Sequence, residues 1–94
     1  MNAERYRITV SRSAATAIAE QLPESVASAA IELISGPLAE TPRRVATPLR
    51  GDLEGLWAAR RGTFRVVFRI DEGRREIVVL RVAHRRHAYR SFGN

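Results

Sequence analysis

The chain lacks cysteine and lysine, and it contains no hydrophobic run long enough to cross a bilayer. The absence of cysteine excludes disulfide bonds, thiolate metal sites and cysteine nucleophiles. The absence of lysine removes the amine that can act as a general base or form a Schiff base. The first residues also lack the basic-then-apolar order of a signal peptide. We therefore expect a cytoplasmic protein that does not contact membranes.

Length and apolar content limit the architecture to one small domain. The chain has 94 residues, of which 45% are hydrophobic. This is enough for a single core and too little for two. No internal repeat and no low-complexity segment interrupts the sequence. We expect one domain over residues 1–94.

Charge is distributed unevenly along the chain. All 16 basic residues are arginine, against ten acidic residues, which gives a net charge of +6. Residues 1–42 contain three arginines and five acids, whereas residues 43–94 contain 13 arginines and five acids. A strongly basic half beside a mildly acidic half predicts one surface for a polyanion and another for a different partner.

The N-terminal part predicts a strand followed by two helices. Residues 5–10 alternate between polar and apolar, which is typical of a strand with one buried side. Apolar residues then recur at helical spacing on both sides of Pro23, and Gly36-Pro37 weakens or ends the second helix. The predicted buried positions are Tyr6, Ile8 and Val10 on the strand, Ala15, Ile18 and Leu22 on the first helix, and Val26, Ala30, Leu33 and Ile34 on the second.

The basic half predicts a loop and then a three-stranded meander. Residues 43–53 read as a loop, and strands are expected over 56–61, 63–70 and 76–83, with a hairpin turn at 71–73. On the last strand, alternation sets Val78, Leu80 and Val82 opposite Ile77, Val79 and Arg81. The resulting order β-α-α-β-β-β predicts an α+β fold, with a twisted antiparallel sheet packed against an N-terminal helical hairpin.

Four arginines fall on one side of the last two strands. They are Arg65 and Arg69 on the first and Arg81, continuing to Arg85, on the second. Burying unpaired guanidinium groups is costly, so this side should be the open face of the sheet. Converging like charges favour an anionic ligand. The alternative is an ordinary solvated face offset by Asp71, Glu72 and Glu76.

The polar segment after the last strand carries the remaining candidate groups. Tyr89 follows Arg85 by four residues, where it could stack on a base, contact a phosphate or take part in proton transfer; it could equally anchor the tail. His84 and His87 are too few to hold a metal ion, although either could carry a proton at neutral pH. We expect no metal site and no cofactor.

Three motifs in this order resemble the RelE branch of the RelE/ParE toxin superfamily. They are L-R-G at 49–51, G-x-x-R-V-V-F-x-I-D at 62–71 and V-x-H-R-x-x-x-Y at 82–89. The resemblance implies the toxin of a type II toxin–antitoxin module, partnered by a small RelB-like antitoxin. It also implies an endoribonuclease that enters the ribosomal A site and cuts mRNA without a metal, by attack of a ribose 2′-OH on the adjacent phosphate.

The resemblance also implies roles for individual residues. Arg65 matches the strand arginine expected to stabilise the transition state, and Arg85 matches the arginine expected to act near the leaving group. Tyr89 matches the tail tyrosine that stacks on the target base or takes part in proton transfer. Arg50 matches an arginine that holds RNA.

One departure from the family pattern concerns the general base. The best-known members have two lysines on the strand equivalent to 56–61, whereas this chain has Arg60 and Arg61 there, and arginine is almost never deprotonated. The general base is then His84, which is our candidate, or a Tyr89 phenolate, or no side chain at all.

The arginines that we assign to RNA or ribosome binding are Arg50, Arg60, Arg61, Arg69, Arg81 and Arg86. The alternative functions are a ParE-like gyrase poison and a catalytically impaired RNA-binding relative.

Overall fold

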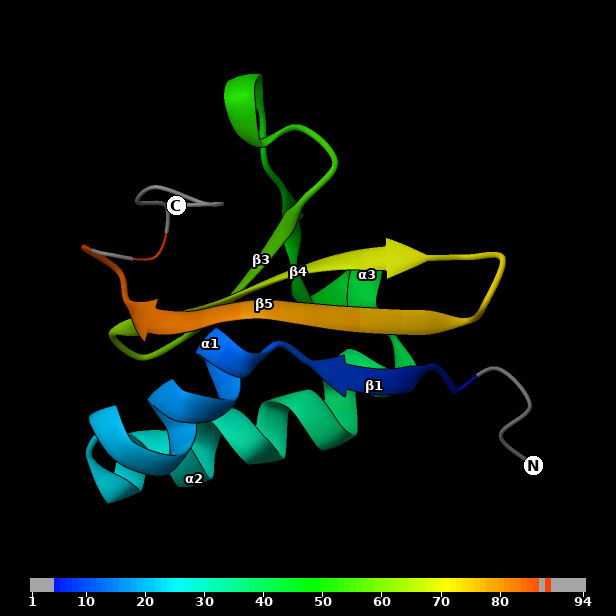
Figure 1. The fold of residues 1–94 in the computed structure, drawn as a ribbon. Coiled ribbons are helices and arrows are strands. Elements are labelled where there is room, and N and C mark those ends of the chain that lie inside the picture. The colour runs from blue at the N-terminus through cyan, green and yellow to red at the C-terminus, as the bar shows by residue number, and fades with distance from the viewer. Residues whose placement is uncertain (1–4, 87, 89–94) are drawn as a thin grey trace.

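The computed structural model describes residues 5–86 and residue 88. Within this part of the chain, five strands form one sheet in the order β1-β5-β4-β3-β2, and the helices cover one of its faces (Figure 1). The strands are β1 (Arg7–Val10), β2 (Thr47–Pro48), β3 (Trp57–Arg61), β4 (Phe64–Asp71) and β5 (Glu76–His84). The helices are α1 (Arg12–Thr16), α2 (Glu24–Leu33) and α3 (Pro42–Val45), with π-helical turns η1 (Ala17–Gln21) and η2 (Ile34–Leu38) and a 3₁₀ turn η3 (Gly51–Leu53).

The predicted meander is confirmed, and two edge strands extend it. Strands β3, β4 and β5 pair antiparallel, whereas β1 runs parallel to β5, with Arg7 opposite Glu76. The antiparallel expectation thus holds for the meander but not for β1. The segment 43–53 is not the plain loop that we expected, because it contains α3, β2 and η3. Elements of two to four residues are too short to show a periodicity in the sequence.

The helical hairpin packs against the sheet through small and aliphatic side chains. The Ser11 hydroxyl accepts a hydrogen bond from the Ala14 backbone N–H at 3.1 Å and caps α1. Ala14 and Ala17 are buried, whereas Ala15, which we expected in the stripe, is exposed. The apolar stripe predicted for the second helix is confirmed, because Val26, Ala30 and Leu33 of α2 and Ile34 of η2 all belong to the core or pack against it.

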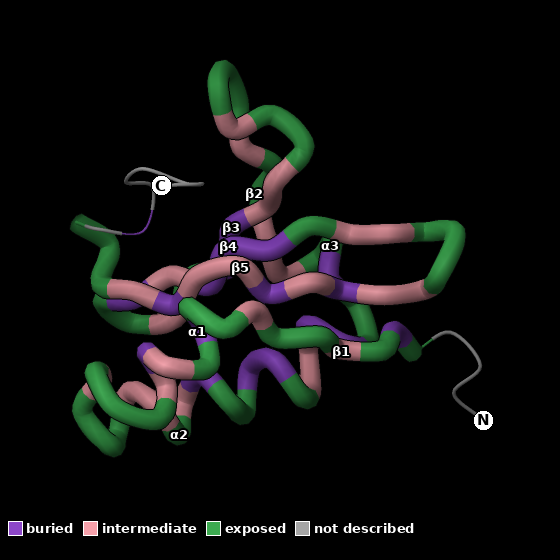
Figure 2. Tube along the Cα trace, viewed as in Figure 1, coloured by how far each residue is buried: buried purple, intermediate pink, exposed green. Residues whose placement is uncertain are grey.

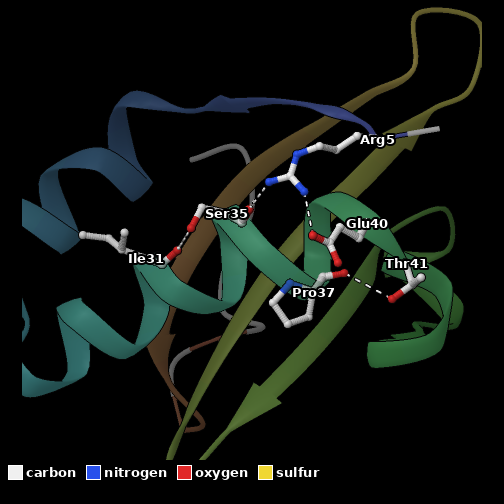
Figure 3. Close-up of polar contacts among 6 residues, drawn as sticks. All are labelled: Arg5, Ile31, Ser35, Pro37, Glu40 and Thr41. Carbon is white, nitrogen blue, oxygen red and sulfur yellow. Dashed lines mark hydrogen bonds and ion pairs between the residues drawn. The ribbon is translucent and has the colours of Figure 1, made fainter. Parts of the chain in front are cut away.

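Of the two outcomes predicted at Gly36-Pro37, the second helix does not end there but continues as a π-helical turn. It widens into η2, because a proline has no N–H to donate to the preceding turn. Hydroxyl groups donate hydrogen bonds to backbone carbonyl oxygens around this turn. Ser35 Oγ donates to the Ile31 oxygen at 2.8 Å, and Thr41 Oγ1 donates to the Pro37 oxygen at 3.3 Å (Figure 3). Arg5 donates to the Ser35 oxygen at 2.6 Å and to Glu40 at 2.7 Å, which holds Arg5 against η2 and the residues that follow it.

Most buried residues lie between the helices and the sheet, along the central strands (Figure 2). Phe64, Val66 and Phe68 of β4 form the middle of this core. A second, smaller cluster lies on the opposite face of the sheet. It consists of Ala58, Val67 and Ala88, with Leu49 and Leu56 packed against it.

A β-bulge in β5 decides which side chains face the core. Val67 lies opposite Arg81, but the next residue of β4, Phe68, lies opposite Val79, so Leu80 is the extra residue. The bulge places Val82 in the same core as Ile77 and Val79, which corrects the alternation expected from the sequence. Arg81, one position earlier, stays on the open face.

Candidate nucleic-acid interface

The open face of the sheet carries two rows of side chains across neighbouring strands. In the first row, Arg60 of β3 lies opposite Arg65 of β4, which lies opposite Ala83 of β5. In the second row the order is Thr47, Ala58, Val67 and Arg81, from β2 to β5. Arg69 lies further along β4 on the same face, opposite Val78. We call Arg60, Arg65, Arg69 and Arg81 the arginine face.

The β3–β4 turn sets the register of the Arg60–Arg65 pair. Gly62 has a φ of 61°, a left-handed conformation that glycine adopts without strain. The two-residue turn makes Arg61 pair with Phe64, and Arg60 with Arg65. Neighbouring strand residues face opposite sides, so Arg61 lies on the helical side and Arg60 on the open side.

A hollow of about 210 Å³ lies on the arginine face. It is lined by Thr47, Leu49, Ala58, Arg60 and Arg65. Ala58 and Leu49 belong to the small apolar cluster of this face, so the floor is apolar and the two guanidinium groups stand beside it. We call it the open-face hollow.

The carboxylates that could neutralise the positive charge of the arginine face form ion pairs or hydrogen bonds with other residues. Asp71 lies 3.9 Å from Arg74, and Glu72 lies 2.6 Å from Arg43. Glu76 accepts a hydrogen bond from Thr9. Within the part of the chain that the structure describes, no ion pair involves Arg60, Arg65 or Arg69. The three acids at this end of the sheet therefore do not neutralise Arg60, Arg65 or Arg69.

Glu72 belongs to a polar cluster at the end of the sheet that carries the β4–β5 turn. The Tyr6 hydroxyl donates to Glu72 Oε2 at 2.8 Å, and the Arg75 guanidinium lies 4.2 Å from the centre of the Tyr6 ring. The hydrogen bond from Tyr6, followed by the one from Arg43, lowers the pKa of Glu72 below its ordinary value. The same contact with Glu72 raises the pKa of Arg43. This cluster ties β1, α3 and the β4–β5 turn together.

The segment after β5 returns to the open face. The Arg85 N–H donates to the Thr63 oxygen at 2.9 Å, which holds the exposed Arg85 beside the β3–β4 turn. Ala88 is fully buried against Ala58 and Val67. Tyr89, the tail residue proposed for catalysis, lies outside the described residues.

Two further predicted RNA-binding residues are exposed at the edges of the molecule. Arg50 directly precedes η3, in the connection between β2 and β3. Arg86 follows β5, and its N–H donates to His84 Nδ1 at 3.2 Å. The backbone thus presents both arginines to solvent without bringing them into the open-face hollow.

His84 lies on the other side of the sheet from Arg65. It pairs with Phe64, a core residue, at the end of β5. Its side chain borders a hollow of about 140 Å³ together with Leu22, Pro23, Val26, Thr63 and Phe64. The structure therefore does not bring our candidate base to the arginine that it would serve.

Sequence reasoning missed three residues that line the open-face hollow. The sequence predicts a loop at Thr47 and Leu49 and no role for Ala58. The alternation of Thr47 and Leu49 about Pro48 is the one signal that could have indicated an edge strand facing the arginines.

The described part of the chain, residues 5–86 and 88, offers neither a cluster of metal ligands nor a helix that spans a bilayer. No group of three or more histidine, aspartate or glutamate side chains there is arranged to hold a metal ion. No helix in the same part of the chain has the length and apolar character that spanning a bilayer requires.

The chain thus combines a five-stranded mixed sheet, a helical hairpin on one of its faces and arginines on the other. The profile of the family described as "ParE toxin of type II toxin-antitoxin system, parDE" matches residues 4–89, and the chain belongs to this family. It is 42% identical over 85 residues to Toxin RelE of Mycobacterium tuberculosis (strain ATCC 25618 / H37Rv), covering 90% of this chain and 87% of that toxin. These findings make it a toxin of the RelE branch.

Two further similarities support this assignment. Toxin RelG of the same organism is 44% identical over 70 residues, which cover 74% of this chain and 80% of that toxin. The toxin–antitoxin complex RelBE2 of M. tuberculosis contains a chain that superposes with a TM-score of 0.81 at 38% identity, covering 86% of this chain and 92% of that one.

Proposed function

We propose that this toxin is a ribosome-dependent endoribonuclease that cleaves mRNA in the A site and so inhibits translation. The observation that carries the proposal is the Arg60–Arg65 pair beside the open-face hollow, with no carboxylate bonded to either arginine among the described residues. Two guanidinium groups at paired positions on neighbouring strands can bind a phosphate together, because each presents a planar fork of N–H donors.

The proposed reaction is an in-line displacement at phosphorus. The ribose 2′-oxygen forms a bond to the adjacent phosphorus and loses its proton, while the bond to the 5′-oxygen breaks and that oxygen gains a proton. The products are a 2′,3′-cyclic phosphate and a 5′-hydroxyl. Arg65 stabilises the charge on the crowded phosphorane, and Arg85 acts near the leaving oxygen.

Proton removal from the 2′-hydroxyl cannot be assigned to an arginine, because a guanidinium stays protonated. The position of His84 on the helical side favours the two other possibilities that the sequence leaves: a Tyr89 phenolate, or catalysis by charge and positioning alone. Positioning by a large ribonucleoprotein explains why naked RNA should be a poor substrate.

We also propose a small RelB-like antitoxin as the partner of this toxin. Support comes from the solved relative, which is a toxin–antitoxin complex. A partner segment that covers the arginine face would exclude RNA from it, and negative charge on that segment would complement the positive charge of its guanidinium groups.

The test is to express the toxin in bacterial cells and map mRNA 5′ ends. Cuts within codons, on translated messages only, are the expected result. On saturating ribosomes, Arg65→Ala should lower the cleavage rate by about 10²–10³-fold. The control is Arg74→Ala, which removes an exposed arginine at the far turn. Intact messages together with gyrase–DNA cleavage complexes would instead indicate a ParE-like poison, and RNA binding without cleavage an impaired relative.

A further inference from the structure

The open-face hollow has two chemically distinct sides. Arg60 and Arg65 form a cationic side, whereas Leu49 and Ala58 form an apolar floor that continues into the small cluster around Val67. A phosphate alone would use only the cationic side. An apolar floor next to paired cations fits a whole nucleotide, with its base on the floor and its phosphate at the guanidinium groups.

The size of the hollow agrees with this occupant. Its volume is about 210 Å³. A protein cavity of about 150 Å³ holds a benzene ring, so this space is large enough for a planar nucleobase. Ala58 lies between Thr47 and Val67 on this face, and its side chain is a single methyl group that leaves the hollow open.

Thr47 places a hydroxyl on the rim of this space. It lies opposite Ala58 on the edge strand β2, and it is exposed. No hydrogen bond joins its Oγ1 to another residue of the described chain. A hydroxyl can donate one hydrogen bond and accept two, so it can reach the polar edge of a base that rests on the apolar floor.

We propose that the open-face hollow is a nucleobase subsite and that Thr47 is a specificity-determining residue, which contributes to the codon preference of cleavage. The inference rests on the proposed function, and it names the part of the substrate that the site reads. The base would be that of a nucleotide next to the cleaved phosphate. One rotatable hydroxyl discriminates weakly, so Thr47 would bias the choice of codon without determining it alone.

The experiment measures cleavage on ribosomes programmed with mRNAs that carry each of the four bases at every position of the A-site codon. Wild type is compared with Thr47→Val, which keeps the shape and β propensity of threonine, and with Thr47→Ser, which keeps the hydroxyl. The control is Thr9→Val, on the opposite edge strand β1 and on the same face of the sheet. Thermal melting of each variant verifies folding.

We expect Thr47→Val to reduce the ratio of kcat/KM between preferred and disfavoured codons by about 3- to 10-fold, the contribution of one hydrogen bond. Thr47→Ser and Thr9→Val should keep the wild-type ratio. Three results would overturn this inference without touching the proposed function. They are an unchanged ratio in Thr47→Val, an equal loss of kcat/KM on every codon, and a wild-type toxin that shows no codon preference. Absence of cleavage by the wild-type toxin would overturn the proposed function, and this inference with it.

Discussion

Arg60 and Arg61 are neighbours on β3, yet they lie on opposite faces of the sheet. Arg60 is opposite Arg65 on the open face, and Arg61 is opposite the core residue Phe64. Alternation along the strand causes this separation, and the two-residue turn at Gly62 fixes the register that sets Arg60, not Arg61, opposite Arg65. Two arginines that look equivalent in the sequence therefore lie on different faces of the sheet.

Replacement of these two arginines should have unequal effects on RNA engagement. Arg60→Ala is expected to raise the apparent KM for ribosomes by about 10-fold or more, the contribution of a charge-assisted hydrogen bond. It should also reduce the slope of log affinity against log salt by about 0.7–0.9, because one phosphate contact is lost. Arg61→Ala removes the same charge and serves as the matched control. Equal losses in the two variants would argue against a specific role for the open face.

Replacement of His84 should leave the chemical step unchanged. His84 borders the hollow on the helical side and does not line the open-face hollow with Arg65. We expect the single-turnover cleavage rate of His84→Ala on saturating ribosomes to remain within about twofold of wild type, since loss of a general base costs about 10²–10⁴-fold. A loss as large as that of Arg65→Ala would identify His84 as the base after all.

Replacement of Gly62 should destabilise the toxin through the backbone alone. Its φ is 61°, and a Cβ placed there would meet no atom within 4 Å. Gly62→Ala is therefore expected to lower the free energy of unfolding by about 1–2 kcal/mol, the cost of the left-handed conformation. The control is Gly36→Ala in η2, where the space is equally open and φ is not positive. It should be neutral or stabilising in the same denaturant titration.

Stability in acid should depend on Glu72. Hydrogen bonds from Tyr6 and Arg43 lower its pKa in the folded state, so folding favours the ionised carboxylate. This contribution is complete above the ordinary carboxyl pKa of about 4.3 and is lost as the pH falls through the lower folded value. We expect Glu72→Gln to show a smaller decrease in Tm below pH 4 than wild type.

Thermal melting from pH 7 to pH 2 measures this difference. The matched control is Glu32→Gln, which removes an exposed carboxylate of α2 that has no ion pair among the described residues. Its Tm profile should parallel that of wild type. If Glu72→Gln also parallels wild type, the polar cluster around Tyr6 does not contribute to acid sensitivity.

The sequence by itself determined the elements whose periodicity is local. Alternating residues defined the meander, helical spacing defined the stripe of α2, and the cost of burying guanidinium groups predicted an open face for Arg65 and Arg69. The three ordered motifs indicated the RelE branch, since they follow the chain and need no knowledge of pairing.

Only the tertiary structure decided which face each polar residue takes near a turn, a bulge or an edge. The bulge at Leu80 brings Val82 into the same core as Ile77 and Val79 while Arg81 stays on the open face, and the register at the end of β5 turns His84 away from that face. The pairing of β2 with β3 brings Thr47 to the arginines. These outcomes depend on contacts between distant segments, and a shift of one residue in a strand reverses the face of every side chain that follows.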